Sequence, residues 1–118
     1  MSKMRKDRFL YIKSRLGEKE LLGQLIEESA ELIQASRKLC RFLEGVSLPN
    51  RSVIECQENF VEEIADVLLT MELLDIDMEK ANEWMESKAK RWEVRLRTEE
   101  ESQKDKHSCN RSNAVPLE

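Results

Sequence analysis

The sequence predicts an all-α protein, an antiparallel helical bundle of four helices in one chain. Apolar residues recur at three- and four-residue steps over long stretches of the 118 residues, which is the spacing of a helix that buries one face. No stretch of useful length alternates apolar and polar residues as a half-buried strand does. The connections between the later helical stretches are short, and short connections favour antiparallel neighbours.

Glycine and turn residues divide the chain into the expected helices. Gly17 breaks the first amphipathic stretch, and Gly45 stands in C-cap position after the second. Pro49 and Asn50 supply turn chemistry before the third stretch, and Asp77 is a suitable N-cap for the last helix. The helices are expected over residues 4–14, 18–43, 53–74 and 78–97.

The end of the chain differs in composition from the rest. From Thr98 onward, charged and polar residues follow one another without apolar periodicity. We therefore expect residues 1–100 to form one all-α domain and residues 101–118 to be a disordered polar tail. The final Leu117-Glu118 is typical of residues left by an expression vector, so this end is given no functional weight.

Composition and charge exclude several classes of protein. Aromatic residues make up only 5% of the chain, and the net charge of −4 argues against a protein that binds nucleic acid by neutralising phosphates. No apolar run reaches the roughly 18 residues that span a bilayer, and the N-terminus lacks a signal-peptide pattern. The three cysteines are widely spaced and odd in number, which indicates reduced thiols in a cytoplasmic protein.

Carboxylates lie at the edge of the apolar face of the second expected helix. At about 100° per residue, Glu28 lies on the shoulder of the apolar stripe that contains Leu25 and Leu32, and Glu31 lies about 60° further out on the same edge. Glu27 points almost directly away, toward solvent. Because a carboxylate beside buried apolar residues is destabilising unless it is paired, this placement indicates a functional role.

The third expected helix repeats the arrangement. Glu63 lies on the shoulder of its apolar stripe, Asp66 lies about 60° further out, and Glu62 faces away. If the two helices pack side by side, Glu28 and Glu31 meet this second pair, and only protonation or a cation relieves the repulsion. Four carboxylates suit a hard divalent ion, Mg²⁺ first and Mn²⁺ next. Either motif alone occurs often by chance in a chain with 24 acidic residues.

The last expected helix carries the opposite charge. Lys88, Arg91 and Arg95 recur at i, i+3 and i+7 and form one basic edge. Taken alone this edge is more simply a solvated face, but a polyphosphate needs both a metal ion and basic side chains. Gln24, one turn before Glu28, could contact a nucleotide or hydrogen-bond a neighbouring helix. The candidate substrate-binding residues are therefore Gln24, Lys88, Arg91 and Arg95.

Together these residues resemble a known family. Glu27-Glu28-x-x-Glu31 followed after a loop by Glu63-x-x-Asp66 is similar to the E-E-x-x-E and E-x-x-D signature of MazG-like all-α nucleoside triphosphate pyrophosphohydrolases. The run Lys88-x-x-Arg91-x-x-x-Arg95 resembles the basic ending of small members of the family. The similarity covers roughly residues 17–97.

The resemblance implies Mg²⁺-dependent cleavage of a nucleotide between its α and β phosphates. It also implies a homodimer or a dimer of dimers, in which packing of the long helices completes the bundle. Carried over by residue, Lys88, Arg91 and Arg95 would hold phosphates. Glu27 would either support the metal ligands without binding the ion or act as the base for water, a role that Glu31 could also take. The implied Mg²⁺ ligands are Glu28, Glu31, Glu63 and Asp66.

Two other interpretations of the function stay open. The chain could be a non-catalytic helical dimerisation or adaptor module, whose acidic edges serve solubility. It could also be a pyrophosphohydrolase that acts on a phosphoribosyl-nucleotide. The sequence shows no residue set for reading a particular base or sugar.

Overall fold

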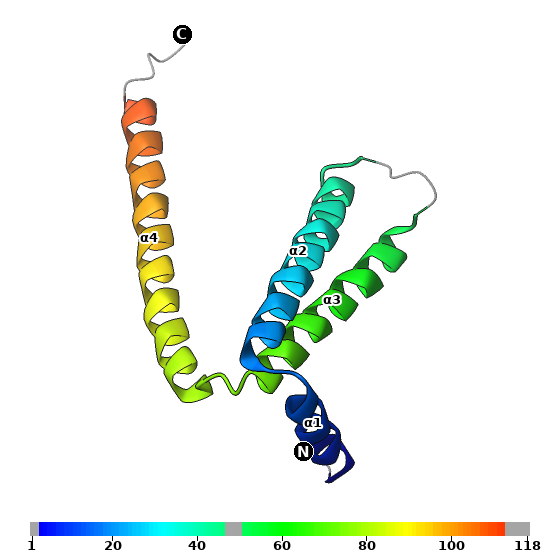
Figure 1. The fold of residues 1–118 in the computed structure, drawn as a ribbon. Helices are drawn as coiled ribbons and strands as arrows, with labels where there is room; N and C mark the ends of the chain where they lie inside the picture. Colours follow the sequence, from blue (N-terminus) through cyan, green and yellow to red (C-terminus); the bar gives the residue numbers. More distant parts are fainter. Residues whose placement is uncertain (1–2, 47–50, 113–118) are drawn as a thin grey trace. The chain divides into compact units, whose positions relative to one another are not determined.

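The computed structural model describes residues 3–46 and 51–112, and these residues form four α-helices without a strand (Figure 1). The all-α prediction is therefore confirmed. The helices are α1 (Lys3–Arg15), α2 (Glu18–Leu43), α3 (Val53–Leu73) and α4 (Met78–Ser112). The chain divides into two compact units, residues 1–76 and residues 77–118.

Local hydrogen bonds explain where the helices begin and end. The Ser52 hydroxyl accepts the backbone N–H of Glu55 at 3.2 Å, and Asp77 Oδ1 accepts the N–H of Lys80 at 3.0 Å, which confirms the predicted N-cap. Gly45 adopts a φ of 84° just after α2, a left-handed conformation that favours glycine at a helix end. The predicted turn residues Pro49 and Asn50 lie outside the described residues.

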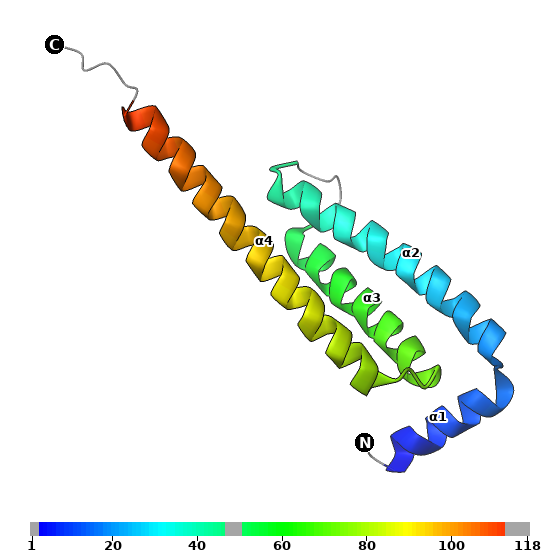
Figure 2. The same ribbon diagram turned by 90° about the vertical axis from the view of Figure 1, so that its left-hand side faces the viewer.

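The first unit is built on the pair α2 and α3, which lie side by side (Figures 1 and 2). One face of each helix supplies the buried residues of a small core. The Thr70 hydroxyl, although buried, donates to the backbone carbonyl of Asp66 at 2.8 Å and is therefore satisfied. The buried residues are Leu21 and Ala35 from α2, and Cys56, Thr70 and Leu73 from α3.

Two surface ion pairs attach α1 to the end of α3. Arg5 donates to both carboxylate oxygens of Glu72 at 2.9 and 3.1 Å, and Lys13 pairs with Asp75. Asp75 has a φ of 54°, a left-handed conformation that aspartate tolerates better than most residues. Since exposed ion pairs contribute about 1 kcal/mol or less, these contacts orient α1 more than they stabilise the fold.

The second unit consists of α4, which is longer than the sequence suggested. We expected the helix to end near Arg97 and residues 101–118 to form a disordered tail, whereas α4 continues to Ser112. Its residues are mostly strong helix formers, and ion pairs one turn apart support it, such as Glu93 with Arg97 at 3.6 Å. The division into a domain of residues 1–100 and a tail stays a prediction, and Leu117-Glu118 lies outside the described residues.

The outward faces of α2 and α3 expose large apolar side chains. Ile26 and Ile33 of α2 are 72% and 60% exposed, and Val61 and Leu68 of α3 are 63% and 54% exposed. Scattered exposed apolar residues are common, but a contiguous apolar patch usually marks a surface that binds a partner. Even so, none of the described helices has the length and apolar content needed to cross a membrane.

The tight contact between α2 and α3 predicts the effect of adding volume to the core. Ala35 is only 1% exposed, so Ala35→Leu should lower the free energy of unfolding by roughly 1–3 kcal/mol through overpacking. Ala30→Leu, at an exposed position of the same helix, is the matched control and should not destabilise the protein. Urea denaturation of both variants measures the difference, and equal stabilities would contradict the packing described here.

Candidate metal centre

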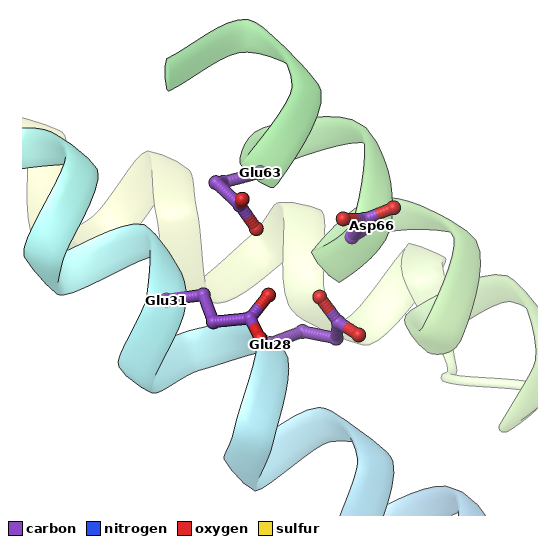
Figure 3. A group of neighbouring side chains, drawn as sticks. All are labelled: Glu28, Glu31, Glu63 and Asp66. Carbon is purple, nitrogen blue, oxygen red and sulfur yellow. The ribbon is translucent and has the colours of Figure 1, made fainter. Parts of the chain in front are cut away.

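Four carboxylates from α2 and α3 meet in the first unit (Figure 3). Each side chain offers one oxygen, and these oxygens all lie within 4.8 Å of one another. Three of the side chains are half-buried and Glu31 is exposed. The carboxylate cluster consists of Glu28 and Glu31 from α2, and Glu63 and Asp66 from α3.

Helical spacing and core packing together produce the cluster. In each helix the two acids are three residues apart, which places them on one edge of the helix. The neighbouring face of the same helix is buried, for example at Leu21 in α2 and at Thr70 in α3. When these faces pack, the two acidic edges are brought together, as the helical-wheel positions predicted.

Two oxygens of the cluster are buried without a partner. Gln24 Nε2 donates to Glu28 Oε1 at 2.6 Å, but Glu28 Oε2 and Glu63 Oε2 have no hydrogen-bond donor among the described residues. A buried anionic oxygen without a donor is strongly unfavourable. A proton or a cation at this place would satisfy both oxygens.

The proximity of the carboxylates changes the pKa of Glu31. The pKa of Glu31 is raised above its ordinary value of 4.5, first by the hydrogen bond that its protonated carboxyl makes to Glu63, then by the negative charge of Glu63. Desolvation by neighbouring atoms and the charge of Asp66 also raise the pKa of Glu31, whereas a hydrogen bond with Glu28 lowers it. In the absence of a cation, the cluster therefore retains a proton more readily than isolated carboxylates do.

The donor set fits a metal ion. Hard divalent cations prefer carboxylate oxygens, and a cation would neutralise the like charges that protonation relieves only in part. The two unpartnered oxygens, Glu28 Oε2 and Glu63 Oε2, are available as ligands. The carboxylate cluster could thus bind a metal ion.

The other predicted site residues are not among the four members of the cluster. Glu27 is exposed on α2, as its helical-wheel position suggested. Lys88, Arg91 and Arg95 are exposed on α4, in the second unit, where the Arg95 guanidinium lies over the Trp92 ring at 5.9 Å from its centroid. Sequence reasoning did not identify the bond from Gln24 to Glu28, although the i, i+4 spacing of the two residues permits it.

Comparisons with known proteins give no match: no family model, no curated protein and no solved structure matches this chain. The likeness to MazG-like pyrophosphohydrolases therefore rests on sequence motifs, which are E-E-x-x-E, E-x-x-D and the basic run of Lys88, Arg91 and Arg95.

The raised pKa of Glu31 predicts how metal-free stability depends on pH. The folded protein holds this proton more tightly than the unfolded chain, so the stability that it contributes is lost as pH rises above about 4.5. Glu31→Gln keeps a neutral side chain at every pH, and its melting temperature should therefore increasingly exceed that of the wild type between acid and neutral pH.

Thermal melts in EDTA across this pH range measure the effect. Glu27→Gln, which removes an exposed carboxylate outside the cluster, is the matched control. A difference between Glu31→Gln and the wild type that stays constant with pH would contradict the coupling of Glu31 to Glu63.

Proposed function

We propose that this protein is a Mg²⁺-dependent nucleotide pyrophosphohydrolase that cleaves a ribo- or deoxyribonucleoside triphosphate to the monophosphate and pyrophosphate. The observation that carries the proposal is the convergence of four carboxylates within 4.8 Å of one another. These acids stand in two motifs that together resemble one family signature. A site that gathers negative charge suits a substrate that arrives with a divalent cation.

In this proposal the carboxylate cluster holds the metal. Glu28 and Glu63 contribute the oxygens that have no other partner, and Glu31 and Asp66 complete the set, with Mg²⁺ preferred and Mn²⁺ as a substitute. When bound, the ion supplies charge neutralisation for the phosphates and lowers the pKa of water.

A carboxylate of α2 accepts the proton of the attacking water. Glu31 is the exposed member of the cluster, so in this proposal it can accept a proton from a solvent water at the site. Glu27, exposed one turn earlier, is the alternative base. The water oxygen then forms a bond to phosphorus in line with the bond that breaks, and pyrophosphate leaves with the electron pair of that bond.

Basic residues of α4 bind the phosphates. Lys88, Arg91 and Arg95 share one edge of the helix, and charge-assisted hydrogen bonds from such residues to phosphate oxygens are strong. Their positive charge stabilises the departing pyrophosphate.

A second copy of the chain completes the bundle. The helix α3 packs one apolar face against α2 and also exposes Val61 and Leu68, and exposed apolar side chains that lie together favour burial against a partner. We expect a homodimer or a dimer of dimers in the cytoplasm, acting on a small nucleotide and binding neither nucleic acid nor membrane.

The decisive experiment is a substrate panel scored for pyrophosphate release in the presence of Mg²⁺. The panel contains ribo- and deoxyribonucleoside triphosphates together with a phosphoribosyl-nucleotide. Turnover of one or more triphosphates that stops in EDTA is expected. Turnover of the phosphoribosyl-nucleotide alone would redirect the proposal, and no turnover together with no Mg²⁺-dependent rise in melting temperature would favour a non-catalytic module.

Substitution of a single cluster carboxylate should abolish this turnover. Glu63→Gln removes one of the two unpartnered oxygens and should lower Mg²⁺-dependent pyrophosphate release by about 100-fold or more, without loss of metal-free thermal stability. Glu62→Gln changes the adjacent, exposed residue and should keep wild-type turnover. Wild-type turnover in Glu63→Gln would show that the site has been misassigned.

The proposed assembly predicts the mass in solution. Light scattering should give about two or four times the chain mass of 13.9 kDa, and Val61→Asp should reduce it because a buried charge is unfavourable at an apolar interface. Val94→Asp is the matched control, since Val61 and Val94 are 63% and 62% exposed. A wild-type protein with the mass of one chain would contradict the assembly.

A further inference from the structure

We infer that Gln24 is a positioning residue for the carboxylate cluster: its side-chain amide holds one oxygen of Glu28 and so directs the other oxygen toward the metal ion. The inference rests on the metal site of the proposed function. It assigns Gln24 a role different from the nucleotide contact that the sequence suggested.

The two oxygens of Glu28 have different surroundings. Glu28 Oε1 accepts a hydrogen bond from Gln24 Nε2 at 2.6 Å, while Glu28 Oε2 is buried and has no donor among the described side chains. Figure 3 shows the Glu28 carboxylate beside those of Glu31, Glu63 and Asp66. The bond from Gln24 thus fixes the rotation of the carboxylate and leaves one oxygen available as a ligand.

The chemistry of an amide suits this task. Gln24 and Glu28 are one turn apart on α2, where side chains four residues apart meet. A lysine or arginine at this position would neutralise Glu28 and compete with the metal, and a glutamate would add a further negative charge to the cluster. A neutral donor orients the carboxylate without either effect, as hydrogen-bond partners of metal ligands do.

Metal affinity tests the inference directly. Gln24→Met keeps the length of the side chain but removes the donor, so the dissociation constant for Mn²⁺, measured by calorimetry without nucleotide, should rise about 10- to 100-fold. The melting temperature in EDTA should stay near that of the wild type, because Gln24 is exposed. Gln34→Met, at another exposed position of α2, is the matched control and should bind Mn²⁺ like the wild type.

The outcomes separate this inference from the proposed function. A wild-type protein that binds no Mn²⁺ would overturn the metal site itself. If the wild type binds Mn²⁺ and Gln24→Met binds it equally well, only the role of Gln24 is refuted. An unchanged Mn²⁺ affinity with a raised KM for the nucleotide at saturating metal would make Gln24 a substrate contact, which also refutes the inference.

Discussion

Electrostatic repulsion between carboxylates on α2 and α3 is the constraint around which the first unit is organised. Burying the apolar faces of these helices forces their acidic edges together, so the packing that stabilises the helix pair also creates the charge cluster. The sequence of α3 contains no lysine or arginine that could relieve the repulsion from within the helix. A proton relieves the repulsion in part, as the raised pKa of Glu31 indicates, and a cation would relieve it further.

All four carboxylates of the cluster lie on helices and none lies on a loop. Metal ligands must keep their relative positions closely, and ligands on rigid elements do so better than ligands on loops. Within α3, the hydroxyl of Thr70 donates to the backbone carbonyl of Asp66, and Arg5 of α1 pairs with Glu72 near the end of the helix. The regular backbone of α2 and α3 thus sets the relative positions of the four carboxylates.

Helical periodicity explains why so much of the cluster could be predicted. The angle between two side chains on a helix depends only on their spacing, so the inward positions of Glu28 and Glu63 and the outward position of Glu27 followed from the sequence. The helix ends near Gly45 and Asp77 could also be predicted, because each depends mainly on the conformation or the side chain of one residue. The helix bounds of α2 agree with the prediction for this reason.

Features that depend on rotamers or on distant contacts could not be predicted in the same way. The bond from Gln24 to Glu28 requires one of several side-chain conformations. The pair Arg5 and Glu72 joins residues far apart in the sequence, and no periodic pattern marks it. The continuation of α4 to Ser112 could not be predicted from periodicity. Its charged residues favour a helix but form no apolar face.

The reactivity of the buried Cys56 thiol can report on local unfolding of the protein. The side chain of Cys56, in the first turn of α3, is 1% exposed, whereas Cys40 is exposed on α2. A thiol reagent can reach Cys56 only through a local opening of the structure around α3, so its rate of labelling follows the frequency of that opening. A cation that holds the acidic edges of α2 and α3 together would stabilise α3 and slow the labelling of this sulfur.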